Sequence, residues 1–166
     1  MDTMTAPNLS EQIAQVKRDT QMAKEQLLRT FEFVPEDKLR WSPSPMARHA
    51  LWIVGHCGIA NQAFATSLRG EELPLNVSPE EASAQILAAG RDISSREEAI
   101  KLVKDSTTEL LQALDNVTEE MLETSPMSPF GPFPFVFWMR LPAEHIKSHS
   151  FQIDYLQTIW GDLESH

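Results

Sequence analysis

The sequence predicts an all-α protein, a four-helix bundle that forms a single domain over residues 1–166. Apolar side chains recur every three or four residues in four long segments, and no segment shows the alternation of a half-buried strand. The chain has 166 residues, of which 42% are hydrophobic. A chain of this length buries enough surface to fold without disulfides or a structural metal. Any metal site is therefore expected to be functional.

The first two helices are bounded by capping residues and turn residues. The first is predicted over residues 9–34, with Asn8 or Ser10 as its N-cap and Pro35 after its end. The second follows a Ser-Pro-Ser-Pro turn and ends at Gly70. It is apolar nearly all round, which predicts burial among several neighbouring helices.

A long connection separates the second helix from the third. Residues 71–94 mix turn residues with one short helical candidate, where Ser78 precedes a proline and begins a capping box. The third helix is predicted over residues 94–115, with capping-box spacing from Ser94 to Glu97. A connection of this length can cross the bundle from end to end, so a simple up-down-up-down order is not required.

The last third of the chain changes character at a proline-rich segment. One helical turn is predicted over residues 118–123, and residues 125–135 hold four prolines and three phenylalanines, which excludes a regular helix there. The last helix is expected at least from Pro142 to Trp160. If it begins earlier, near Phe135, Pro142 should kink it.

Charge and cysteine content exclude several classes of function. The formal net charge is −10, from 24 acidic and 14 basic side chains, so long-range repulsion disfavours nucleic acid as a partner. No apolar run reaches the roughly 18 residues that a membrane helix needs. The single cysteine, Cys57, cannot form an internal disulfide, and no leader segment is recognisable. These features predict a cytoplasmic protein that associates with neither membranes nor nucleic acid.

Two histidines near the C-terminus have the spacing of metal ligands. His145 and His149 lie four residues apart, so both imidazoles project from one face of the last helix. Gln152 falls on the same apolar stripe, which faces inward. The alternative is a pair of buried histidines with ordinary hydrogen-bond partners, and the spacing alone does not decide between the two.

A third histidine strengthens the metal interpretation. His56 lies in the middle of the apolar second helix, where an imidazole must form a hydrogen bond or bind an ion to offset its burial. Gly55 and Gly58 would let another helix approach it closely. Two ligands from one helix and one from another leave coordination positions open, which is the pattern of a catalytic metal site.

These features together resemble the DinB-like (DinB/YfiT) superfamily. The similarity rests on an N-terminal helix, a Trp-Ser-Pro turn, a helix with a central histidine, and a Pro-Phe-Gly loop that leads to His-x-x-x-His-x-x-Gln. It implies an up-down-down-up four-helix bundle, a divalent metal such as zinc or nickel, and a homodimer. The ligands would be His56, His145 and His149. Members often have Arg and Gly where this chain has Ser150 and Phe151. We therefore expect this chain to lack whatever that Arg does in other members, and to pack differently around the bulkier Phe151.

Further residues are candidates for a substrate pocket near the ion. They are His49, Gln152, Trp52, Phe135 and Trp138. His49 lies two helical turns before His56, too far along the axis to bind the same ion, and it could instead be a partly exposed surface residue. The aromatic residues could form a lid, a core plug or a dimer surface. Cys57 points away from His56 and is interpreted as a small buried apolar side chain.

The resemblance and the histidines favour a metal-dependent enzyme that acts on a small molecule. Zinc can lower the pKa of water to about 7 or hold a thiol as thiolate, and the resemblance adds precedents for low-molecular-weight thiol transfer. Hydrolysis would also need a general acid or base, but Glu144 and Asp154 both lie off the histidine stripe, and no catalytic residue is assigned. The alternatives are a metal- or ligand-binding bundle without turnover, and histidines that only fill the core.

Overall fold

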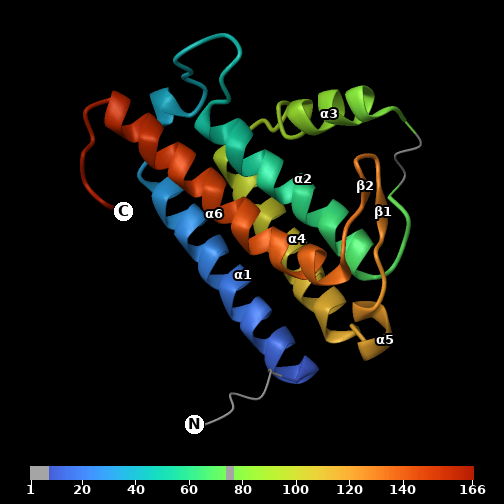
Figure 1. Ribbon diagram of the computed structural model, residues 1–166. Coiled ribbons are helices and arrows are strands. Elements are labelled where there is room, and N and C mark those ends of the chain that lie inside the picture. The colour runs from blue at the N-terminus through green and yellow to red at the C-terminus, as the bar shows by residue number, and fades with distance from the viewer. Residues whose placement is uncertain (1–7, 74–76) are drawn as a thin grey trace, which may run out of the picture.

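Four long helices lie side by side in the computed structural model, which describes residues 8–73 and 77–166 (Figure 1). They are α1 (Leu9–Glu32), α2 (Ala50–Leu68), α4 (Arg96–Asp115) and α6 (Phe135–Ile159). Helix α2 packs mainly against α4 and α6, while α1 packs mainly against α6 and α4. The predicted all-α class is confirmed. None of the helices in the described part of the chain has the length and apolar character that a bilayer crossing requires.

Side chains at the helix starts explain where each helix begins. The Asn8 side chain accepts a hydrogen bond from Glu11 N, and the Glu11 carboxylate accepts one from Asn8 N, both at 3.0 Å. Asn8 rather than Ser10 is therefore the cap of α1. Helix α4 is capped by Ser95 and not, as was predicted, by Ser94. The sequence spacing does not distinguish the two serines, because each has a glutamate three residues later.

The connection between α2 and α4 returns along the bundle (Figure 1). It contains α3 (Pro79–Ala88), which begins with the predicted capping box of Ser78 and Glu81. This return brings the start of α4 to the same end of the bundle as the start of α2.

The proline-rich segment is more ordered than predicted. After the short helix α5 (Glu119–Leu122), strands β1 (Met127–Ser128) and β2 (Gly131–Pro132) form a two-residue antiparallel hairpin. Helix α6 then begins at Phe135 and continues through Pro142. A short 3₁₀ helix, η1 (Glu36–Lys38), follows α1.

Three glycines let backbone segments pack directly against α2. A Cβ added at Gly58 would lie 2.6 Å from Leu102 Cγ on α4, and one at Gly55 would lie 2.5 Å from Ile93 Cγ1. Gly90 has a φ of +84°, and a Cβ there would lie 2.2 Å from the backbone nitrogen of His56. The predicted close approach of another helix is confirmed at Gly58, which packs against α4. At Gly55 the prediction was wrong about the neighbour, because the loop between α3 and α4, not a helix, packs there.

Candidate metal centre

The three predicted ligands meet between α2 and α6. His145 Nε2 lies 3.2 Å from His56 Nε2 and 3.2 Å from His149 Nε2. His56 and His149 are buried, with 3% and 7% of their surface exposed, and His145 is half-buried. The rings come from two distant parts of the sequence, His56 on α2 and the His145–His149 pair on α6, and their ligand nitrogens all lie within 4.8 Å of one another.

This spacing fits a divalent transition metal. Zinc–imidazole bonds of 2.0–2.1 Å in tetrahedral geometry place two ligand nitrogens about 3.3 Å apart. Three imidazoles suit zinc or nickel, and they leave at least one coordination position for another molecule. The donor set, the spacing and the convergence of the Nε2 atoms therefore all fit a bound ion.

Gln152 fixes the protonation pattern of one ligand. Its Oε1 lies 2.8 Å from His149 Nδ1. An amide oxygen only accepts hydrogen bonds, so the proton of the neutral ring must sit on Nδ1. The lone pair of Nε2 then points toward the other two histidines, as metal binding requires.

Burial keeps the three imidazoles neutral. It lowers the pKa of His56 to about 4, with further contributions from the charges of Arg48 and His149. It lowers the pKa of His145 to about 3, where His149, His56 and Arg48 also contribute. The pKa of His149 is lowered by burial too, against the opposing effect of its hydrogen bond to Gln152 Oε1. All three rings are therefore available as neutral ligands at neutral pH.

Replacing Gln152 should weaken metal binding without removing a ligand. We expect Gln152→Leu to lower zinc affinity about 10- to 100-fold, because His149 loses the acceptor that fixes its proton on Nδ1. Gln152→Glu keeps an acceptor at the same place and should bind zinc at least as tightly as the wild type. Competition titration against a chromogenic zinc chelator measures both affinities. Equal affinities for the Leu variant and the wild type would contradict this role.

The stability of the metal-free protein should fall as the pH falls from 7 to 5. The unfolded chain takes up protons on its histidines below their ordinary pKa of about 6.5, whereas folded His56 and His145 stay neutral until about 4 and 3. Each of these two histidines should lower the free energy of unfolding by about 2 kcal/mol over this range. Urea unfolding in the presence of a chelator measures the loss. His145→Gln should have a clearly shallower pH dependence, and an equal slope would contradict the pKa assignment.

The other candidate residues occupy different places. His49 caps α2, because its Nδ1 accepts a hydrogen bond from Trp52 N at 3.0 Å. Phe135 and Trp138 lie in the buried cluster at the hairpin end of the bundle, 1% and 5% exposed. Cys57 is fully buried, and burial raises the pKa of its thiol, as expected for a residue without a reactive role.

A pocket of about 620 Å³ lies between the start of α2, the end of α3 and α6, and none of the three histidines lines it. Two of the predicted pocket residues, Trp52 and Gln152, line it, and Gln152 links it to His149. The pocket also contains Arg48 and Arg91, which the sequence reasoning missed as site residues. Arg48 lies one helical turn before Trp52 in sequence, but Arg91 reaches the pocket through the fold and has no local signal.

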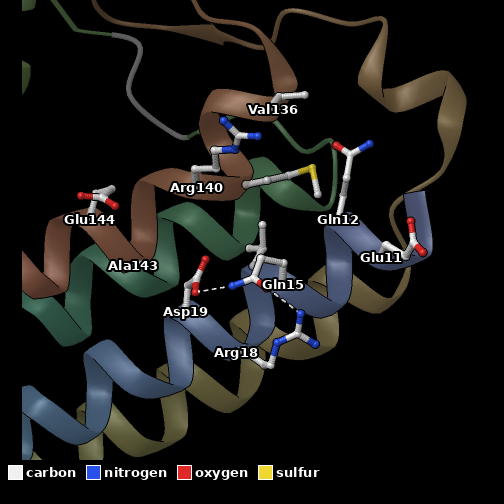
Figure 2. A pocket seen from close by; sticks show the side chains of 11 residues that line it. Glu11, Gln12, Gln15, Arg18, Asp19, Val136, Arg140, Ala143 and Glu144 are labelled. Carbon is white, nitrogen blue, oxygen red and sulfur yellow. Dashed lines mark hydrogen bonds between the residues drawn. The ribbon is translucent and has the colours of Figure 1, made fainter. Parts of the chain in front are cut away.

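A second cleft, of about 530 Å³, lies between α1 and the first half of α6 (Figure 2). Its polar side chains bind one another: Gln15 Nε2 donates to Asp19 Oδ1 at 2.7 Å, and Arg18 Nη2 donates to Gln15 Oε1 at 2.6 Å. Glu144 lines this cleft and not the histidine cluster. Asp154 accepts a hydrogen bond from Thr30 Oγ1. Neither carboxylate is placed as a base for the candidate metal centre.

The fold and the three converging imidazoles define a class of protein, the helical bundles with a three-histidine group that could hold a metal ion. The sequence pattern of the DinB superfamily matches residues 19–153, and the chain belongs to that superfamily. The family resemblance is thereby confirmed. No curated protein sequence matches this chain.

Solved structures with the same fold include a mycothiol-dependent maleylpyruvate isomerase. A histidine-to-alanine mutant of that enzyme has a TM-score of 0.68 and 16% identity, and the match covers 90% of this chain and 63% of the isomerase. The isomerase itself has a TM-score of 0.64 and 17% identity, with the same coverage. This chain thus spans less than two thirds of the isomerase. A conserved protein from Enterococcus faecalis has a TM-score of 0.68 and 15% identity, with 89% of this chain and 96% of that protein covered.

Proposed function

We propose that the protein is a metal-dependent enzyme that transfers a low-molecular-weight thiol to, or hydrolyses, a small molecule. The observation that carries the proposal is the convergence of three neutral imidazole Nε2 atoms, His145 Nε2 being 3.2 Å from each of the other two. His56, His145 and His149 would hold a zinc or nickel ion. Such an ion, when bound, supplies a Lewis acid that favours the thiolate form of a thiol or activates water.

The residues around the centre favour thiol transfer over hydrolysis. A thiolate is itself the nucleophile, whereas hydrolysis works best with a nearby general base. Glu144 faces the cleft of Figure 2, and Asp154 is bound to Thr30. The similarity of the fold to a mycothiol-dependent isomerase supports the same preference.

Metal analysis and a thiol-transfer assay together test the proposal. The protein, purified from medium that contains zinc and nickel, should carry about one ion per chain. With a panel of cellular thiols and electrophiles, at least one pair should react faster with the wild type than with His149→Ala. If the protein carries an ion but no thiol and electrophile pair reacts in a way that depends on His149, the alternative function is indicated, namely a bundle that binds a metal or another ligand without catalysis. Metal well below one ion per chain would contradict both the metal-dependent enzyme and a metal-binding bundle.

The proposal extends to the organisation of the protein. We infer one domain over residues 1–166, with up-down-down-up connectivity supported by the return of the α2–α4 connection along the bundle. The single buried thiol suits the cytoplasm, and the exposed Phe130 and Phe137 support a homodimer. Light scattering at two protein concentrations measures the oligomeric state, and a monomer at both would contradict the dimer.

A further inference from the structure

The pocket beside the histidine cluster contains two arginines and no acidic side chain. Arg48 and Arg91 line it together with Trp52 and Gln152. The whole chain has 24 acidic and only 14 basic residues, so a pocket with this composition is electrostatically unlike the rest of the protein. A concave site that carries one sign of charge raises the local concentration of the opposite ion.

Both guanidinium groups contact the same indole ring. Arg91 Cζ lies 4.8 Å and Arg48 Cζ 5.7 Å from the centroid of the Trp52 ring. Cation–π contacts of this kind orient the two groups. Two cations that share one ring also repel each other, and an anion between them would relieve that repulsion.

Neither arginine has an anionic partner within the described part of the chain. Arg48 Nε is buried and makes no hydrogen bond. Arg69, by contrast, pairs with Glu71 and Glu109, and Arg96 donates to the backbone oxygens of Phe31 and Val34. The two pocket arginines thus keep their guanidinium donors available for a ligand. The planar fork of a guanidinium group matches the two oxygens of a carboxylate.

The remaining walls of the pocket are largely apolar. Trp52 is 8% exposed, while Phe151 and Tyr155 of α6 are 51% and 69% exposed. An apolar cavity with a few polar groups at one end suits a small molecule that has an apolar body and one charged end. Gln152, which lines the pocket, also contacts His149 at Nδ1, the ring nitrogen remote from the Nε2 cluster, so a molecule bound here would lie behind the His149 ring.

We propose that Arg48, Arg91 and Trp52 form the substrate subsite of this centre, and that the subsite binds the carboxylate of a small apolar acid. The inference rests on the proposed function, because it names the substrate class of the same site. The arginines hold and orient the carboxylate, and the apolar side chains of Trp52, Phe151 and Tyr155 contact the apolar body of the acid. They bind substrate and take no part in proton transfer.

Titration of the full-length, metal-free protein with phenylacetate tests the subsite, because carboxylate then has no ion to bind. The Trp52 indole N–H donates to Ala89 O at 3.0 Å, so its ¹H–¹⁵N signal, assigned with Trp52→Phe, reports on the pocket. We expect phenylacetate to shift this signal to saturation. Phenylacetamide, which has the same shape without the charge, should bind with a dissociation constant at least fivefold higher.

Substitutions locate the binding and separate it from the metal. Arg48→Gln and Arg91→Gln should each raise the dissociation constant of phenylacetate at least fivefold. Arg91 is exposed, so its variant keeps the fold even if the Arg48 variant does not. Arg140→Gln, in the cleft of Figure 2, is the matched control and should bind like the wild type.

The outcomes distinguish this inference from the proposed function. Equal binding of phenylacetamide, or wild-type binding by Arg91→Gln, would overturn the carboxylate subsite even if zinc binds. Binding of phenylacetate that depends on both arginines, in a protein that takes up no zinc, would support the subsite and contradict the metal-dependent enzyme. Zinc titration of the same samples gives the second measurement.

Discussion

His145→Ala should abolish stoichiometric zinc binding. Its Nε2 is the atom that lies 3.2 Å from both of the other ligand nitrogens, so its loss removes the centre of the cluster. Structural zinc sites with four ligands bind with about 10–16 kcal/mol, or roughly 2.5–4 kcal/mol for each ligand. Loss of one ligand should therefore lower zinc affinity about 100- to 1000-fold. Chelator competition measures the affinity, and mass spectrometry of the purified protein measures the content.

The matched control is His49→Ala. His49 is a histidine close to the same centre in sequence, but it caps α2 because its Nδ1 accepts a hydrogen bond from Trp52 N. Its replacement should lower the free energy of unfolding by about 1 kcal/mol and leave zinc affinity unchanged. Circular dichroism checks that both variants are folded, and His149→Gln provides a second ligand variant if His145→Ala is not. Zinc affinity of His145→Ala and His149→Gln equal to that of the wild type would contradict the metal centre.

Local sequence features predicted the elements of the fold and the three histidines, because these features act over a few residues. The His145–His149 spacing follows from the geometry of one helix, and the cap at Ser78 follows from one capping box. The start of α4 was misplaced by one residue because Ser94 and Ser95 carry the same local signal. His49 was predicted as a substrate-pocket candidate because it lies two helical turns before His56, and only the fold shows that its ring instead accepts a hydrogen bond from Trp52 N.

The substrate pocket depends on contacts that local patterns do not encode. Arg91 follows α3, Arg48 precedes α2 and Trp52 lies in the first turn of α2. The three meet because the α2–α4 connection returns along the bundle. Gly90, one position before Arg91, lets the loop approach α2. The sequence shows that a glycine is present there, but only the fold shows that it packs against Gly55 and His56.

Gly90→Ala should therefore damage both the fold and the metal centre. Its φ of +84° is unfavourable for alanine, and the new Cβ would lie 2.2 Å from His56 N and 2.5 Å from the backbone carbon of Gly55. Because backbone atoms cannot rotate away, the loop must move off α2. Together, the strain and the overpacking should lower the free energy of unfolding by about 3 kcal/mol or more.

Gly161→Ala separates these two contributions. Gly161 has nearly the same φ, +88°, but nothing lies within 4 Å of its added Cβ. Its replacement should lower the free energy of unfolding by only about 1 kcal/mol and leave zinc binding unchanged. Urea unfolding measures both variants, and zinc titration of Gly90→Ala should show weaker binding because the displaced loop no longer fixes the backbone of His56. Equal losses of stability in the two variants would show that the loop does not press on α2, and that His56 is positioned by α4 and α6 alone.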